Sequence, residues 1–88
     1  MSKTEIIENF EFAVDQIRNS NSKQATNDQK LKFYAYYKQA IVGKCNVAQP
    51  WAINAVERAK WDSWNSLGDM SKESAMIKYC ELYMSING

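Results

Sequence analysis

The stretch FYAYYKQAIVG, residues 33–43, places four aromatic rings within five positions and follows them at once with Lys38 and Gln39. Its run of helix-forming residues ends at Gly43, where a helix C-terminus is expected. At 100° per residue, the core-facing stripe of this helix is predicted to consist of Phe33, Tyr37, Ala40 and Ile41.

Tyr34 and Lys38 lie one turn apart on a neighbouring stripe of the same helix. A phenol and an ammonium in this register can both donate hydrogen bonds to one anionic group, and bonds to charged groups are the stronger kind. The same pattern also suits a tyrosine at the rim of the core beside a solvated lysine. The pair is therefore a candidate anion site with a structural alternative.

Helical patterns continue on both sides of this stretch. The first shows one apolar face made of Ile6, Phe10, Ala13, Val14 and Ile17, and the spacing of Ser2 and Glu5 offers it a capping box. Residues 19–28 are polar and predict a loop. Thr26 and Gln29 form a second capping box, which opens a helix that runs to about Val42.

Two more helices are predicted after an irregular segment, residues 43–54. Asn54 and Glu57 have the spacing to cap a helix that ends near Leu67, and Ser71 can cap a last helix that reaches about Ile86. No alternating pattern predicts a strand, so we expect an all-α four-helix bundle. Because the 43–54 connection is longer than usual between antiparallel neighbours, a simple up-down-up-down order is not assured.

Composition predicts one soluble domain that spans residues 1–88, with 45% hydrophobic and 24% charged residues. No apolar run is long enough to cross a membrane, and acidic residues stand where a secretory signal needs an apolar core, so a cytoplasmic protein is expected. Cys45 and Cys80 have no metal-ligand spacing, and the chain contains no histidine. No metal site is predicted, and an enzyme ranks last because no nucleophile–base pair can be named.

Charge is divided unevenly along the chain. Residues 20–60 hold seven basic and two acidic residues, a net charge of +5, whereas the remainder holds four basic and eight acidic residues, a net charge of −4. Just after the cationic part, Trp61 and Trp64 face the same way, and Lys60 stands beside Trp61. The helix that ends near Leu67 is therefore either an ordinary amphipathic helix with two core tryptophans or part of a surface for an anionic ligand with a flat ring.

Three motif blocks resemble the acyl-CoA-binding protein family, in order and at the family's spacing. The first contains Tyr34, Tyr37, Lys38, Gln39, Ala40, Gly43 and Asn46, and Pro50 follows it. The second is Arg58–Asn65, and the third contains Ser71–Glu73, Ala75, Met76 and Tyr79. The resemblance extends from about Phe10 to Tyr83, nearly the whole chain.

The resemblance implies an up-down-down-up bundle that binds long-chain fatty acyl-CoA thioesters without turning them over. It implies an intracellular acyl-CoA carrier and pool former that works as a monomer, with no cofactor, no nucleic-acid partner and no stable membrane insertion. Tyr34, Lys38 and Lys60 match positions that hold the 3′-phosphate of CoA. Tyr37 matches the adenine pocket or the core, Tyr79 a ligand contact from the last helix, and Arg18 a further cation.

We further expect an acyl-chain groove built from Leu31, Ile53, Val56 and Ala59. This chain departs from the family at Trp51, where glycine is frequent, and at Val56, where a basic residue is common; Val56 is expected to extend the groove. Two other functions stay open. A helical domain that grips a partner protein predicts an exposed apolar patch, and weak nucleic-acid binding through the cationic part predicts a steep salt dependence.

Overall fold

The computed structural model describes residues 2–19 and 25–87, and these residues form four helices and no strand. The helices are α1 (Lys3–Asn19), α2 (Asn27–Ile41), α3 (Ala55–Asn65) and α4 (Lys72–Asn87). The all-α prediction is confirmed. Residues 20–24 of the predicted loop lie outside the described residues. Among the helices described, none is long and apolar enough to cross a membrane.

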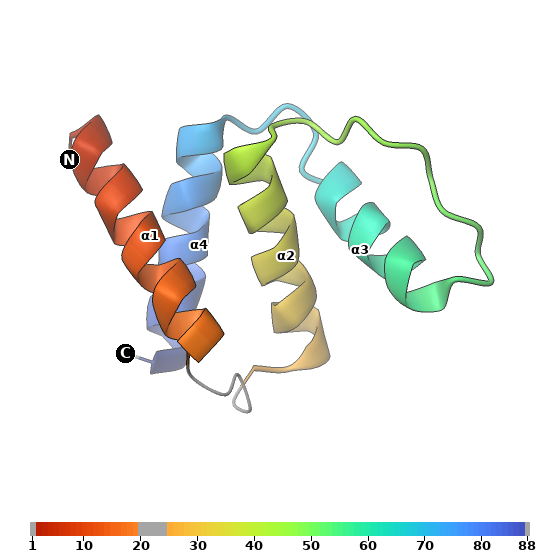
Figure 1. Cartoon of the computed structure of the whole chain (residues 1–88), viewed down its shortest axis with the longest axis horizontal. Coiled ribbons are helices and arrows are strands. Elements are labelled where there is room, and N and C mark those ends of the chain that lie inside the picture. The colour runs from red at the N-terminus through yellow and green to blue at the C-terminus, as the bar shows by residue number, and fades with distance from the viewer. Residues whose placement is uncertain (1, 20–24, 88) are drawn as a thin grey trace.

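The helices follow the up-down-down-up order (Figure 1). α2 runs back along the bundle after α1, α3 runs in the same direction as α2, and α4 returns in the direction of α1. α2 packs against α4 and α3, and α1 packs against α4. The long 42–54 segment makes this order possible, because it carries the chain from one end of α2 back to the start of α3.

Three of the four predicted helix starts have the expected caps. The Glu5 N–H donates to Ser2 Oγ at 3.2 Å, the Gln29 N–H donates to Thr26 Oγ1 at 3.1 Å, and the Ser74 N–H donates to Ser71 Oγ. The prediction for Asn54 is wrong, because its side chain makes no capping hydrogen bond. Its backbone N–H instead closes a turn on the Trp51 carbonyl at 2.9 Å, which fixes the start of α3 by other means.

The core lies between α1, α2 and α4. The rings of Phe10 and Phe33 meet the ring of Tyr79 edge-on, with centroids 5.2 Å and 5.0 Å apart, respectively. Such pairs add about 0.5–1.5 kcal/mol to the burial of the rings themselves. Ile41, which the sequence pattern placed in the core stripe, is 50% exposed because it borders a shallow hollow between α1 and α2.

Two indole N–H groups of α3 bond to the 43–54 segment. Trp64 Nε1 donates to the Gly43 carbonyl at 2.9 Å, and Trp61 Nε1 donates to the Val47 carbonyl at 2.8 Å. Trp64 is buried as expected, but Trp61 is only half-buried, so the prediction of two core tryptophans is wrong for Trp61. Its indole N–H bonds to the irregular 43–54 segment and not to another helix.

Candidate functional site

The seam between α2 and α3 holds two cation–aromatic pairs. Lys60 Nζ of α3 lies 5.5 Å from the ring centroid of Tyr34 of α2. One turn further along α2, Lys38 Nζ lies 5.1 Å from the ring centroid of Trp64 of α3. Each contact contributes about 0.5–1 kcal/mol at a partly exposed site and helps to hold its lysine in place. The three residues expected at the phosphate therefore lie along one seam.

Glu57 is a member of this seam that sequence reasoning treated only as a capping residue. Its carboxylate lies 3.8 Å from Lys60 Nζ, one helical turn away. Burial raises the pKa of the Tyr34 hydroxyl, and the Glu57 carboxylate and Cys45 raise it further. Tyr34 thus stays a neutral hydrogen-bond donor, and Lys60 has a nearby anion that a bound phosphate must displace or share.

A second cluster joins α1, α2 and α4. Arg18 Nη2 donates to the Tyr37 hydroxyl oxygen at 3.2 Å, and the guanidinium carbon lies 5.7 Å from the Tyr37 ring centroid. Tyr79 is only 4% exposed, and burial raises the pKa of its hydroxyl to about 12, although the Arg18 charge opposes this increase. These three side chains, together with Tyr34, line one small hollow of about 180 Å³.

Tyr34 also lines a larger hollow, of about 460 Å³, between α2 and α3. Three of the four residues expected in the acyl-chain groove border this hollow: Leu31, Val56 and Ala59. Lys30 and Lys60 stand at its polar edge. Among the described residues, Tyr34 is the one lining residue that these two hollows share.

Ile53 and Lys38 lie apart from these hollows. Ile53 is 90% exposed and does not border the α2–α3 hollow, unlike its neighbour Val56. Lys38 borders neither hollow and lies over Trp64 on the seam instead. The structure therefore brings Arg18, Tyr34, Tyr37, Tyr79 and Lys60 together around the hollows, with Lys38 beside them.

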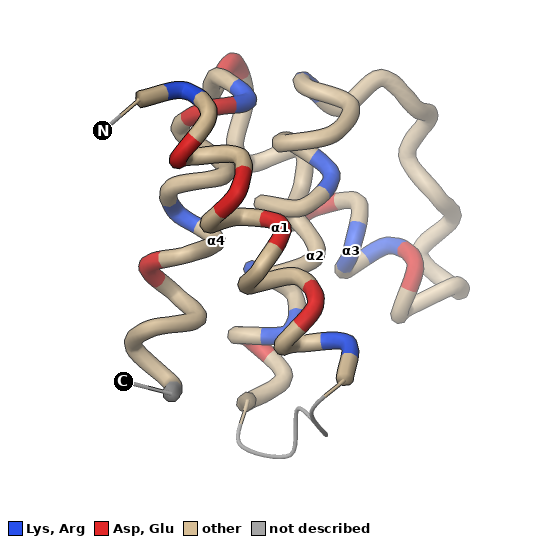
Figure 2. Tube along the Cα trace, turned by 60° about the vertical axis from the view of Figure 1, so that its left-hand side comes forward, with Lys and Arg blue, Asp and Glu red and all other residues tan. Residues whose placement is uncertain are grey.

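The charge asymmetry seen in the sequence is also an asymmetry in space. In the described segment 27–60, six basic residues accompany two acidic ones. By contrast, α1 carries four acidic residues and two basic ones. Figure 2 shows acidic residues along α1 and basic residues on α2 and α3. An anionic ligand is therefore attracted to the side of the molecule that holds the α2–α3 seam.

Gln39 anchors α2, the helix that carries Tyr34 and Lys38, and sequence reasoning did not assign this role to it. The side chain is fully buried, and its Nε2 donates to the carbonyls of Gly68 and Met70 at 3.0 Å and 2.7 Å. These bonds tie the middle of α2 to the connection between α3 and α4. The sequence signal was its place in the first motif block, since α2 carries several other polar residues.

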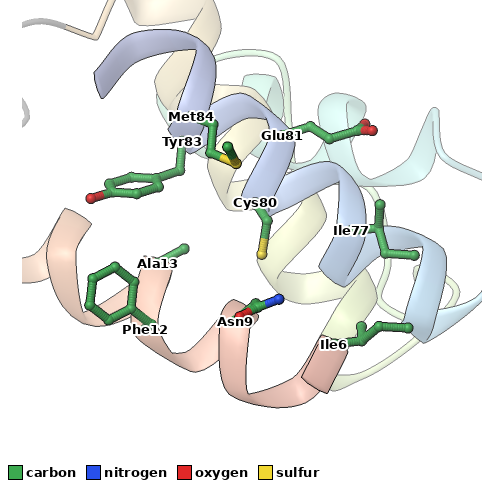
Figure 3. Close-up of a pocket in the computed structure, with 9 residues that line it drawn as sticks. All are labelled: Ile6, Asn9, Phe12, Ala13, Ile77, Cys80, Glu81, Tyr83 and Met84. Atoms are coloured by element: carbon green, nitrogen blue, oxygen red, sulfur yellow. The ribbon is translucent and has the colours of Figure 1, made fainter. Parts of the chain in front are cut away.

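A further hollow of about 380 Å³ lies between α1 and α4 (Figure 3). Its lining is mostly apolar and includes Phe12, Ile77 and Met84, and none of the expected site residues borders it. Cys80 points into this hollow, where burial and the nearby Glu81 raise the pKa of its thiol. A raised pKa disfavours the reactive thiolate.

Comparison with known proteins assigns these features to one family. Residues 7–83 match the family model "Acyl CoA binding protein". Acyl-CoA-binding domain-containing protein 5 of Xenopus laevis is 53% identical over 75 residues, which is 82% of this chain and 16% of that protein. Enoyl-CoA delta isomerase 2 of Homo sapiens is 41% identical over 78 residues, covering 89% of this chain and 20% of that protein. The chain thus spans a fifth or less of the length of these relatives.

Solved structures match the fold closely. Acyl-CoA-Binding Protein 2 of Oryza sativa superimposes with a TM-score of 0.89 at 31% identity, covering 96% of this chain and 90% of that one. The acyl CoA binding protein of Babesia bovis gives a TM-score of 0.81 at 43% identity, with 90% of each chain covered.

Proposed function

Because the chain belongs to the acyl-CoA-binding protein family, we propose that it binds long-chain fatty acyl-CoA thioesters non-covalently and serves as an intracellular acyl-CoA carrier and pool former. The observation that carries the proposal is the position of Tyr34, which borders both the small hollow beside Arg18 and the larger apolar hollow between α2 and α3. A CoA thioester has the matching form, a polyanionic nucleotide joined to an apolar chain.

In the proposed complex the nucleotide lies at the cationic seam. Tyr34, Lys38 and Lys60 hold the 3′-phosphate, since a neutral phenol and two ammonium groups can all donate to phosphate oxygens. Arg18, Tyr37 and Tyr79 surround the adenosine, where aromatic faces and a guanidinium suit a flat ring. The contacts Lys60–Tyr34 and Lys38–Trp64 support this arrangement because they hold both ammonium groups near the seam in advance.

The acyl chain lies along the α2–α3 hollow, against Leu31, Val56 and Ala59. Each CH₂ group removed from water contributes about 0.8 kcal/mol. The chain term therefore grows with length, while the nucleotide term stays constant. This difference gives the proposed preference for long chains.

The proposed role is carriage without catalysis. The similarity to enoyl-CoA delta isomerase 2 covers only a fifth of that relative, and no nucleophile–base pair is found among the residues around the two hollows. We propose a monomer in the cytoplasm that takes no nucleic acid, needs no cofactor and does not insert stably into membranes.

Calorimetric titration with palmitoyl-CoA, free CoA and palmitate tests the function. Tight one-to-one binding of palmitoyl-CoA, weak binding of CoA and no binding of palmitate are expected, with reduced affinity in the Tyr34→Phe and Lys38→Ala variants. If palmitoyl-CoA binds no more tightly than free CoA, the acyl hollow does not take the chain, and the proposal is wrong.

A further inference from the structure

An exposed apolar edge occurs where the 43–54 segment meets α3. The exposed fractions of Trp51, Ile53 and Val56 are 81%, 90% and 66%. The three residues lie within six positions of one another, and a turn closed by the Asn54 N–H on the Trp51 carbonyl precedes α3 there. In Figure 1 this part of the chain forms the outer edge of the molecule, beyond α3.

The fold does not require these side chains to be apolar. The 43–54 segment is held by backbone carbonyls, which accept hydrogen bonds from the indoles of Trp64 and Trp61. Trp51 belongs to neither the buried core nor the apolar residues packed against it. Large apolar side chains that stay exposed without a packing role mark an interaction surface.

The surroundings of this edge are cationic. Val56 shares the α2–α3 hollow with Lys30 and Lys60. Two acidic residues of α3, Glu57 and Asp62, are each paired with a basic neighbour on the same helix. Lys30 makes no ion pair within the described part of the chain, and residues 27–65, from α2 to the end of α3, hold three more basic than acidic residues. The acidic residues of α1 follow a helix that lies at the opposite end of the molecule from α3 (Figures 1 and 2).

We propose that the edge formed by Trp51, Ile53 and Val56 docks peripherally on an anionic lipid bilayer. Tryptophan favours the interface of a bilayer, and basic residues near an anionic surface add to the attraction. A bilayer accounts for the combination of a protruding indole with a cationic surplus and needs no preformed groove on the protein. This docking does not depend on acyl-CoA binding. Only its use, which is exchange of acyl-CoA with a membrane through the adjoining hollow, rests on the proposed function.

Sedimentation of the ligand-free protein with phospholipid vesicles tests the docking. Vesicles of phosphatidylcholine with about one third phosphatidylserine are expected to retain the protein, and pure phosphatidylcholine vesicles to retain much less. Trp51→Ala is expected to weaken retention by about tenfold, because burial of the indole is lost. The matched control is Phe12→Ala, which removes an exposed ring from α1 and should leave retention unchanged. Brominated lipid should quench the fluorescence of the wild type and not that of Trp51→Ala.

Two results overturn the proposal. If anionic vesicles do not retain the wild type, the edge does not dock on a bilayer and serves another contact, such as a protein partner. Equal retention of Trp51→Ala and wild type shows attraction by charge alone, without the apolar edge. Titration of Trp51→Ala with palmitoyl-CoA in the absence of vesicles separates the two proposals, because docking can fail while acyl-CoA binding stays intact.

Discussion

Lys60 of α3 stands over the ring of Tyr34 of α2, with its ammonium nitrogen 5.5 Å from the ring centroid. The contact joins the two helices at Tyr34, which lines both the small hollow and the larger α2–α3 hollow. It positions a cation and a phenol for one anion, although the residues are 26 positions apart in the sequence.

Lys60→Ala is predicted to lower the affinity for palmitoyl-CoA by about tenfold, the lower end of what a charge-assisted hydrogen bond contributes, because Lys60 is partly solvated. Calorimetry checks the change. Lys44→Ala is the matched control, since Lys44 pairs with Asp69 away from both hollows and its loss should have little effect. Palmitoyl-CoA without the 3′-phosphate should bind the wild type and Lys60→Ala about equally. An undiminished difference with this ligand would place Lys60 at another part of the nucleotide.

Val56→Lys is predicted to reduce the preference for long acyl chains. A charged head at the apolar hollow disfavours the distal part of the chain, so the ratio of palmitoyl-CoA to octanoyl-CoA affinity should fall by about tenfold, equivalent to roughly two CH₂ groups of burial. The ratio cancels any effect on the nucleotide. Val47→Lys makes the same change at an exposed valine outside the hollow and should leave the ratio as it is. An unchanged ratio in Val56→Lys would remove Val56 from the groove.

Tyr79 is predicted to make the fold sensitive to alkaline pH. Its pKa is about 12 in the folded protein against an ordinary value of 10.0, so the unfolded chain loses this proton first as the pH rises. The stabilisation is fully present below pH 10 and is lost between pH 10 and pH 12. Tyr79→Phe keeps the ring packing and removes the ionisation, so its melting temperature should fall less steeply over this range. Identical slopes for both proteins would contradict the assignment.

Gln39→Met is predicted to destabilise the fold by about 1–2 kcal/mol, because the carbonyls of Gly68 and Met70 each lose a donor. The loss is partly offset because Gln39 Oε1 is buried with no partner among the described residues. Urea denaturation measures the change. Gln16→Met, at a partly exposed position of α1, should change stability by less than about 0.5 kcal/mol. Equal stabilities for both variants would show that the Gln39 bonds contribute nothing net.

The sequence predicted the helices well because the features that form a helix lie close together in the chain. The periodic apolar face of α1 and the caps at Ser2, Thr26 and Ser71 depend on residues within one or two turns. The cap at Asn54 failed because a tertiary arrangement, the turn at Trp51 and the attachment of the 43–54 segment to α3, sets the start of that helix. Motif resemblance supplied the order of the helices, which periodicity alone left undecided.

The site was predicted in part for the same reason. Resemblance named the residues that border the small hollow, but not the pairing of Lys60 with both Tyr34 and Glu57. The Lys60–Tyr34 contact depends on how closely α3 approaches α2, a distance that no pattern within either helix records. The Glu57–Lys60 pair lies within α3, and its spacing of three residues was a local signal that could have indicated it. Ile53 was expected beside Val56 in the groove, yet it precedes the helix that turns Val56 toward the hollow.

Amide chemical-shift mapping during titration with palmitoyl-CoA locates the bound ligand. The largest shifts are expected on α2 and α3 around Tyr34, Val56 and Lys60, with further shifts at Arg18 and Tyr79. Shifts concentrated instead at Phe12, Ile77 and Met84 would place the acyl-CoA in the hollow between α1 and α4 and rule out binding at the α2–α3 seam.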